Sequence, residues 1–378
     1  MKVFISVFGR FHAFDLAEQL NNNKYLYKIF TTYPYSYLKK YGLKKKQVIS
    51  YPLLELLSRF RKFIPKIFLN YYLEIIYCIF DNLCALYINK KIDIFIGWSG
   101  FSLKSIKKSK KLKIKTILER GSASIDYQKK ILNEEYKKYN CNINIPDLFV
   151  ARELNEYKLT DYINVPSNFS KKTFNKKFKK KIIVNRYGVN TNQFPRIKKN
   201  NNKFIVLYTG GLTLQKGSHY LLKAIHELDY LKNFEFWHLG TINDEMNIFI
   251  NKYHTNKIKF LGHKSQRELF KIYSQCSIFC IPSIHDGLAL VIPQALSCGL
   301  PVICTENSGG KEYIKNNFNG FIIKSKSSYS IKQKILKFYK NPKILNKMRN
   351  NTRILLKDID WCAYGERSIK NLRKVFAA

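Results

Sequence analysis

The sequence predicts an α/β protein built from two successive doubly wound domains, each a parallel sheet with helices on both faces. Two observations predict this class. Short apolar runs of strand length alternate along the chain with segments whose apolar residues recur at helical spacing. A strand, a glycine-containing loop and a helix also follow one another twice, once from residue 3 and once from residue 204. A length of 378 residues suits two such domains.

The first series of elements is assigned to an N-terminal domain of residues 1–197. Its strands are short apolar runs, and the helix between the second and third of them is rich in lysine. The predicted strands lie at residues 3–8, 92–97, 115–119 and 162–167, and the helices at 13–20 and 102–111. Strand, helix and strand at this spacing are typical of parallel βαβ units.

The second series is assigned to residues 198–358. It begins with a linker at 198–203 that has no apolar side chain. The predicted strands lie at 204–208, 234–239, 258–261, 277–281, 301–305 and 320–323, and the helices at 218–228, 267–274 and 290–297. Ser218 is the predicted N-cap of the first of these helices. Residues 359–378 are predicted to form a C-terminal helix that packs back on the N-terminal domain.

Residues 51–96 combine many leucine and aromatic side chains with a small group of basic ones. The basic residues are Arg59, Arg61, Lys62 and Lys66. One interpretation is one or two helices packed in the core. The other is an amphipathic, basic surface that lies on an anionic membrane. The sequence leaves both open.

Charge is the unusual feature of the composition. Lys and Arg number 67 and Asp and Glu 26, which gives a net charge of +41. Such a field attracts phosphate groups, whether of nucleic acid, anionic lipid or a small ligand. Runs of Asn and Lys also fit the drift of an AT-rich genome, so part of the excess needs no functional cause. A nucleic-acid-binding protein is the less favoured reading, because no zinc finger, RNA-recognition signature or arginine-rich tract occurs.

The eight cysteines are scattered, and none forms a Cys-x-x-Cys pair. They signal neither a zinc site nor a redox motif, and they fit a reducing compartment better than a disulfide scaffold. The apolar start of the chain is too short for a signal peptide, and no run of about 18 uncharged apolar residues predicts a transmembrane helix. We therefore expect a cytoplasmic protein.

The loop at 209–218 is the first segment with chemical significance. Gly210 and Gly211 allow a close approach of the backbone to a ligand, and Lys216 comes just before a helix start. Lysine charge, free N–H groups and the helix dipole would together hold a diphosphate there. A plain turn between a strand and a helix is the alternative.

Residues 282–303 and 308–321 carry the more specific signal. The first contains Asp286-Gly287-Leu288-Ala289 and, eight residues after Asp286, Gln294; the second contains Gly309-Gly310 and Asn319-Gly320. In order and spacing, these segments resemble the retaining GT-B glycosyltransferases of family four, the glycosyl transferases group 1 type. The similarity covers residues 204–325 well and is weaker upstream. It implies a GT-B fold, with two Rossmann-like domains facing a central cleft.

The resemblance carries over to individual positions. Asp286 and Gln294 occupy the places of two family glutamates, the first at the donor sugar and the second at the nucleotide ribose. Lys216 matches the lysine on the diphosphate. Gly211 stands where the family often has an arginine, so one positive charge is missing. The family histidine near the cleft is not evident, because residues 119–122 read Glu-Arg-Gly-Ser.

The resemblance and the loops together give a set of candidate site residues. The catalytic candidates are Asp286, Lys216 and His12, the last of which follows the first glycine loop. The donor-binding candidates are Gly210, Gly211, Lys216, Gly262, His263, His285, Gly287, Leu288, Ala289, Leu290 and Gln294. Each also has a structural reading as a turn, capping or solvated residue. No Asp-x-Asp motif occurs in the candidate loops at 209–218, 282–303 and 308–321, so no metal is expected.

The resemblance implies an enzyme that moves a sugar from a nucleotide-sugar to a hydroxyl acceptor with retention. The expected partners are the nucleotide-sugar and a saccharide or lipid-linked glycan of bacterial envelope polysaccharide, lipopolysaccharide or capsule synthesis. The expected place is the cytoplasm, with peripheral attachment to the inner face of the plasma membrane as a hypothesis. The alternative function is that of a GT-B binding protein with impaired catalysis, because Asp286, Gln294 and Gly211 depart from the family pattern.

Overall fold

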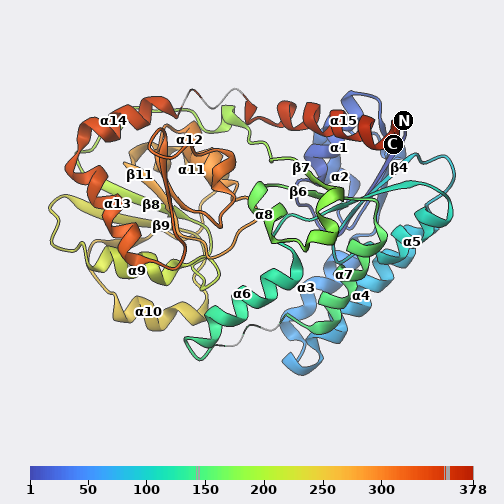
Figure 1. The fold of residues 1–378 in the computed structure, drawn as a ribbon, viewed down its shortest axis with the longest axis horizontal. Helices are drawn as coiled ribbons and strands as arrows, with labels where there is room; N and C mark the ends of the chain where they lie inside the picture. The colour runs from blue at the N-terminus through green and yellow to red at the C-terminus, as the bar shows by residue number, and fades with distance from the viewer. Residues whose placement is uncertain (142, 144, 353, 355–357, 378) are drawn as a thin grey trace.

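The computed structural model describes residues 1–141, 143, 145–352, 354 and 358–377, and it contains two parallel sheets (Figure 1). Every strand pair in both sheets is parallel, as expected for doubly wound domains. The first sheet has the order β3-β2-β1-β4-β5-β6-β7. Its strands are β1 (Val3–Val7), β2 (Leu26–Thr31), β3 (Val48–Ser50), β4 (Ile94–Trp98), β5 (Lys115–Glu119), β6 (Tyr162–Val165) and β7 (Ile182–Val184).

Helices cover both faces of the first sheet. They are α1 (Ala13–Asn22), α2 (Tyr35–Leu38), α3 (Pro52–Arg59), the short 3-10 turn η3 (Phe60–Phe63), α4 (Lys66–Leu86), α5 (Leu103–Lys111), α6 (Ile125–Lys137), α7 (Asp147–Leu159) and α8 (Asn168–Thr173). Sequence periodicity predicted α1 and α5 and most of the strands, but not β2, β3 or β7. β3 and β7 are the edge strands of the sheet, and β2 lies next to β3. The strands at the centre of the sheet are the ones whose sequences are continuous apolar runs.

The second sheet has the order β10-β9-β8-β11-β12-β13. Its strands are β8 (Phe204–Thr209), β9 (Phe234–Leu239), β10 (Ile258–Phe260), β11 (Ile278–Ile281), β12 (Val302–Thr305) and β13 (Gly320–Ile323). The helices that follow are α9 (Ser218–His226), α10 (Asn247–Lys252), α11 (Gln266–Gln275), α12 (Val291–Ser297), α13 (Ser328–Lys340), α14 (Pro342–Asn351) and α15 (Trp361–Ala377). Each predicted strand of this half is present.

The strand order reverses once in each sheet, between β1 and β4 and between β8 and β11. At such a point the loops leaving the carboxyl ends of the two strands diverge to opposite faces and open a crevice. The loops after β1, β4 and β5 therefore gather at one crevice, and those after β8, β11 and β12 at the other. These loops contain the candidate site residues except Gly262 and His263, which follow β10, and Gln294, which lies in α12.

The C-terminal helix α15 lies beside α1 of the first domain (Figure 1). Gly365 is its closest point of approach, because a Cβ there would lie 2.6 Å from the Gln19 side chain. The chain thus crosses back from the second domain, which ties the two domains together by a second connection.

Helix α4 has one face in the core and one in solvent. Ile76, Phe80 and Cys84 are buried, whereas Ile67 is 74% and Tyr71 69% exposed. The prediction of core-packed helices is thus correct for only half of this helix. The residues 67–86 form a helix long and apolar enough to cross a membrane by length and composition, the single one among the described residues, with 22% of its most apolar stretch buried. The sequence-based expectation had found no such segment.

Candidate active site

A cleft of about 1790 Å³ lies between the two domains. Its first wall, here called the acceptor wall, comes from the loops after β1, β4 and β5 of the N-terminal domain. Its second wall, the donor wall, comes from the second domain and from the chain segment 187–194 that leads into it. Of the candidate residues, His12, His263, Leu290 and Gln294 line this cleft. The remaining candidates lie outside its lining.

Lys216 and Asp286, predicted to share a site, are in direct contact. The Lys216 ammonium forms an ion pair with Asp286 Oδ2, and both side chains are partly exposed. They come from loops on either side of the strand-order reversal between β8 and β11, as the fold requires. A lysine that would bind a diphosphate is therefore already held by the carboxylate assigned to the donor sugar.

The turn before α9 differs from the predicted cap. Gly217, with φ of 65°, is the N-cap, and Ser218 is the first residue of the helix. A Cβ on Gly217 would lie 2.1 Å from the Pro282 carbonyl oxygen. Only glycine fits this left-handed position, because the turn packs directly on the loop after β11. Ser218 instead accepts a hydrogen bond from Thr213 N at 3.3 Å.

The loop after β11 packs on the backbone of the N-terminal domain. A Cβ on Gly287 would lie 2.1 Å from the Gly121 carbonyl oxygen, and Ser167 Oγ donates a hydrogen bond of 2.6 Å to the Gly287 carbonyl. Within the described part of the chain, the N–H groups of Gly287 and Leu288 have no hydrogen-bond partner, whereas Ala289 N donates to Ser308 O at 3.4 Å. Two of the three N–H groups expected to face phosphates are therefore available.

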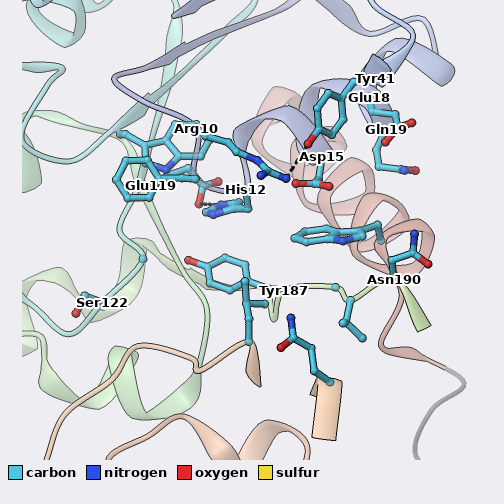
Figure 2. A pocket seen from close by; sticks show the side chains of 18 of the residues that line it. Arg10, His12, Asp15, Glu18, Gln19, Tyr41, Glu119, Ser122, Tyr187 and Asn190 are labelled. Carbon is cyan, nitrogen blue, oxygen red and sulfur yellow. Dashed lines mark hydrogen bonds and ion pairs between the residues drawn. The ribbon is translucent and has the colours of Figure 1, made fainter. Parts of the chain in front are cut away.

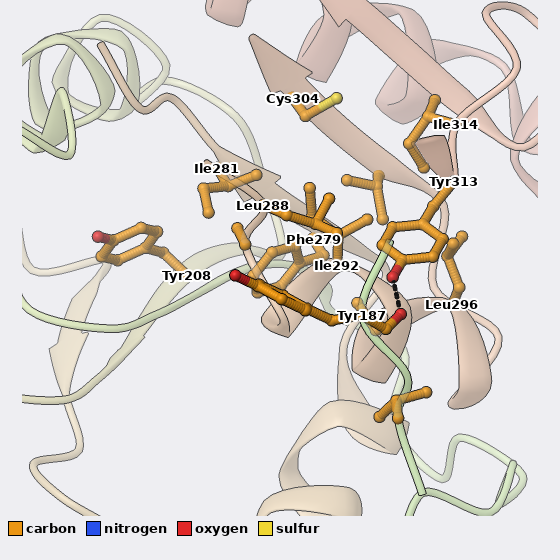
Figure 3. Packing of buried hydrophobic residues seen from close by; sticks show 14 of the residues in the cluster. Tyr187, Tyr208, Phe279, Ile281, Leu288, Ile292, Leu296, Cys304, Tyr313 and Ile314 are labelled. Atoms are coloured by element: carbon orange, nitrogen blue, oxygen red, sulfur yellow. Dashed lines mark hydrogen bonds between the residues drawn. The ribbon is translucent and has the colours of Figure 1, made fainter. Parts of the chain in front are cut away.

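The apolar side of this loop is anchored in the core (Figure 3). Leu288 is buried in one cluster with Phe279 of β11 and Ile292 of α12. The Tyr313 hydroxyl donates a hydrogen bond to the backbone carbonyl of Tyr187, which joins this core to the segment between the domains. The loop's backbone is thereby fixed before any ligand binds.

His285 is fully buried, and neither ring nitrogen has a hydrogen-bond partner among the described residues. Burial lowers its pKa to about 4, against the opposing attraction of Asp286. The imidazole is therefore neutral near pH 7. It lies behind the ion pair and not on the cleft wall, so the sequence-based placement of its side chain at the donor stays a prediction.

His12 lies on the acceptor wall beside a buried carboxylate (Figure 2). Its Nε2 is 3.4 Å from Glu119 Oε2, and its ring centroid is 4.3 Å from that of Tyr187. Asn164 Nδ2 donates to both Glu119 oxygens, at 2.8 and 3.0 Å. These contacts fix the imidazole orientation. Glu119 belongs to the segment 119–122, where the resemblance led us to look for the family histidine. In this chain that segment supplies a carboxylate, which contacts a histidine of the loop after β1.

Arg120, next in that segment, has a structural place. Its guanidinium is 3.0 Å from the Glu153 carboxylate, and it also donates to Gln128 Oε1 at 2.6 Å and to the Ala123 carbonyl at 2.9 Å. The side chain is largely buried. A buried arginine with this many acceptors holds the β5–α6 loop in shape.

Phe11 is one of several cleft residues that the sequence analysis did not single out. It lines the cleft, is 59% exposed and has a φ of 42°. A bulky aromatic residue at positive φ stores strain, and an exposed one gains little from burial in return. Its neighbour Arg10 donates to the Tyr37 and Tyr41 hydroxyls at 3.2 and 2.9 Å. No periodicity or spacing signals a strained aromatic residue in a loop.

Asp15 completes this corner of the acceptor wall (Figure 2). Burial raises its pKa to about 6, although Arg10 and His12 oppose the shift. A carboxyl group at the cleft thus titrates near neutral pH. It can accept or donate a hydrogen bond to a ligand hydroxyl according to its protonation.

Helix α6 joins the two walls. Glu135, at its end, is buried against the second domain, where it contacts His219 Nε2 at 3.1 Å, the Tyr220 hydroxyl at 2.7 Å and Lys326 Nζ at 3.1 Å. Burial opposes its ionisation, but the hydrogen bonds from these three groups outweigh that cost and lower its pKa to about 2. His219 and Tyr220 belong to the first turn of α9, directly after Lys216. The N-terminal domain therefore holds the first turn of α9, next to the loop that carries Lys216, in position.

No group of three or more His, Cys, Asp or Glu side chains within the described ranges is arranged to hold a metal ion. All eight cysteines are free, and five of them are buried. Burial raises the pKa of thiols such as Cys280 and Cys304, which makes them poor nucleophiles and poor metal ligands at neutral pH.

Comparison with known proteins decides the family of the second domain. Residues 189–354 match the family model described as glycosyl transferases group 1. The chain carries a glycosyl transferases group 1 domain. HepE from Anabaena, solved with UDP and with UDP-glucose, superposes with a TM-score of 0.68 at 14% identity, over 99% of this chain and 100% of that one. The fold is therefore GT-B, as the sequence predicted.

Two curated relatives illustrate the range of the sequence likeness. An uncharacterized glycosyltransferase of Methanocaldococcus jannaschii is 27% identical over 57% of this chain and 59% of its own length. The UDP-Gal:alpha-D-GlcNAc-diphosphoundecaprenol alpha-1,3-galactosyltransferase of Escherichia coli is 28% identical over 40% of each chain. The chain thus spans about half the length of the curated relatives it matches.

Proposed function

We propose that this protein transfers a sugar from a nucleotide-diphosphate sugar to a hydroxyl acceptor, with retention and without a metal ion. The observation that carries the proposal is the contact between Lys216 and Asp286 at the start of α9, inside the group 1 domain. Lysine and carboxylate meet in the loops after β8 and β11, at the strand-order reversal where doubly wound domains typically bind their ligands.

The charge that develops on the leaving diphosphate needs stabilisation. Lys216, which exchanges Asp286 for phosphate oxygens, supplies a positive charge, and the free N–H groups of Gly287 and Leu288 supply fixed dipoles. Asp286, once released, accepts hydrogen bonds from donor-sugar hydroxyls. Gln294 and Leu290 on the donor wall lie where the ribose would be bound.

The acceptor would enter along the acceptor wall, where His12, Phe11 and Asp15 lie. His12 is oriented by Glu119 and so presents a fixed ring edge to the reacting hydroxyl. The relative from Escherichia coli acts on a diphosphoundecaprenol acceptor, which supports a lipid-linked acceptor of envelope polysaccharide, lipopolysaccharide or capsule synthesis. The enzyme would then work in the cytoplasm, at the inner face of the membrane.

The test is a thermal-shift screen against nucleotide diphosphates and nucleotide-sugars, followed by transfer assays with excess EDTA. A ligand at about 100 times its Kd should stabilise the protein by roughly 2.7 kcal/mol. We expect a UDP-type or other nucleoside diphosphate to shift the melting temperature, and transfer to survive EDTA. No shift with any nucleotide contradicts the proposal, and activity that needs added manganese contradicts the metal-independent part.

A second candidate is a GT-B binding protein with impaired catalysis. The shorter Asp286, the uncharged Gln294 and the missing arginine at Gly211 favour it. The two candidates differ in slow donor hydrolysis, which a competent GT-B enzyme shows without an acceptor. Tight donor binding without hydrolysis or transfer would establish the binding protein.

A further inference from the structure

The outward side of η3 and α4 carries a continuous row of large apolar side chains, here called the apolar strip. Its members are Phe60, Phe63, Ile67, Tyr71, Ile75 and Ile79, with exposed fractions between 43% and 79%. From Ile67 onward the spacing is four residues, which places these side chains on one helix face. A contiguous apolar surface of this kind marks an interaction site, whereas single exposed apolar residues do not.

The charges around the strip have one sign. Arg59, Arg61 and Lys62 are exposed at its start, and Lys90 and Lys91 follow the end of α4. The side chain of Lys66 lies outside the described part. Glu55 forms an ion pair of 3.3 Å with Arg59, whereas Glu74 and Asp81 face the interior of the domain. Among the described residues, no carboxylate pairs with the other basic residues around the strip, Arg61, Lys62, Lys90 and Lys91.

Each of these carboxylates has an internal partner. Glu74 and Asp81 bind the Arg152 guanidinium, each at 2.9 Å, and Glu55 accepts a hydrogen bond of 2.8 Å from the Thr32 hydroxyl. The pairing with Arg152 of α7 also ties α4 to the domain. The two carboxyl groups that bind Arg152 and the packed inner face keep α4 from leaving the domain to span a bilayer, so it is a surface helix.

We propose that the apolar strip docks this protein on a membrane surface rich in anionic lipid. An interfacial helix of this type buries its apolar face by about 5–10 Å at the boundary of headgroups and acyl chains, with its basic residues among the headgroups. The occupant is a lipid surface and not an acidic protein, because the basic residues flank the apolar row at both ends, as headgroups around acyl chains require.

The same helix connects this surface to the cleft. Leu73 and Tyr77, on the inner side of α4, line the cleft between the domains. Docking through the outer side therefore brings the cleft to the membrane surface. The substrate class that follows is an amphiphile whose lipid stays in the bilayer while its head group enters along α4; this part rests on the proposed transferase function, whereas the docking does not.

The experiment is co-sedimentation of the full chain with vesicles of phosphatidylcholine alone and with vesicles in which about a third of the lipid is phosphatidylglycerol. Each basic residue near such a surface contributes about 1 kcal/mol, so Arg59, Arg61 and Lys62 changed together to Gln should weaken binding on the order of 100-fold. The matched control changes Lys340, Lys343 and Lys347 of the second domain to Gln, which removes the same charge and should leave binding unchanged. High salt should release the wild-type chain, since charges are screened within about 3 Å at 1 M.

A second variant tests the apolar contribution, with Ile67, Tyr71 and Ile75 changed to Gln. These side chains are exposed, so the change should spare folding and the thermal shift with nucleotides while abolishing vesicle binding. Equal binding to both lipid mixtures, or an equal loss in the control, overturns the proposal. So does a wild-type dimer that the second variant converts to a monomer without any vesicle binding, because the strip would then join two copies. Failure of nucleotide binding would refute the transferase and leave the docking result standing.

Discussion

The donor-side loops after β8 and β11, which lie outside the cleft lining, are built on backbone contacts and one ion pair, whereas the acceptor wall is built from side chains. On the donor side, Gly217 and Gly287 lie where no Cβ fits, and short loops hold N–H groups and Lys216 in place. On the acceptor side, Phe11 and His12 project from a strained loop and meet residues from several other strands.

This difference follows from what each wall would bind. A diphosphate is the same in every nucleotide-sugar, and backbone groups with one lysine recognise it without reference to the sugar. An acceptor differs from enzyme to enzyme, and side chains on loops can vary without loss of the fold. The family resemblance is therefore carried by the donor side, whereas the acceptor side is described from this chain's own contacts.

The largest effect is expected where the two walls meet, at Gly287. Changing Gly287 to Ala places a Cβ 2.1 Å from the Gly121 carbonyl oxygen, and neither backbone can move without shifting its domain. We expect transfer to fall by more than about 100-fold, from overpacking of about 1–3 kcal/mol combined with a displaced loop. Gly211→Ala, whose nearest contact would be 3.4 Å, should leave the melting temperature unchanged. If Gly287→Ala has the thermal stability and the activity of the wild type, the close contact between Gly287 and the Gly121 carbonyl does not exist in solution.

The contacts of Glu135, at the end of α6, with the second domain give the next largest effect and a dependence of stability on pH. Glu135→Gln should lower the free energy of unfolding by on the order of 2–4 kcal/mol at pH 7, because a buried carboxylate with four partners is lost: His219, Tyr220, Lys326 and Lys138. The pKa of Glu135 is lowered to about 2, so its contribution is complete above the ordinary pKa near 4.5 and is lost as pH falls toward 2. Urea unfolding at pH 7 and pH 3 should show a smaller drop for the variant than for wild type. Glu134→Gln, on the exposed side of α6, is the control and should behave as wild type.

A third prediction separates the two members of the ion pair. Lys216→Ala should weaken nucleotide-diphosphate binding by about 1.5–3 kcal/mol, the usual size of a charge-assisted contact. Asp286→Asn should leave that affinity equal or tighter, because it frees Lys216, and should lower transfer. Calorimetry with the diphosphate and an assay with the full donor measure the two effects. Lys223→Ala, exposed on the helix that follows Lys216, is the matched control. Equal diphosphate affinities for Lys216→Ala and Lys223→Ala would show that Lys216 does not bind the diphosphate.

The smallest effect concerns Phe11. Phe11→Gly should raise stability by about 1 kcal/mol, because glycine adopts a φ of 42° without strain and the lost side chain is 59% exposed. It should also raise the KM for the acceptor several-fold while nucleotide affinity stays the same. Lys24→Gly, at another positive φ of 63° on the surface, should stabilise without any change in KM. If Phe11→Gly lowers stability, the residue packs in the fold and is no acceptor contact.

The sequence by itself determined the fold class and paired Lys216 with Asp286, which are in contact in the structure. The strands of the second domain are continuous apolar runs, and the loops that join them keep their glycines and Lys216 at family spacing, so local patterns sufficed. The error at Ser218 arose because serine is a strong N-cap by propensity. The structure instead uses Gly217, since only a residue without Cβ clears the Pro282 carbonyl in a neighbouring loop.

Only the tertiary structure decided three features: the acceptor wall, the contacts of Glu135 with the second domain, and the exposed side of α4. His12 and Glu119 are 107 positions apart, and Glu135 and His219 are 84 apart, so neither pair leaves a trace in local spacing. An amphipathic helix looks the same in sequence whether its second face meets another element or solvent. The exposure of Ile67 and Tyr71 depends on what the rest of the chain leaves uncovered, which is a property of packing.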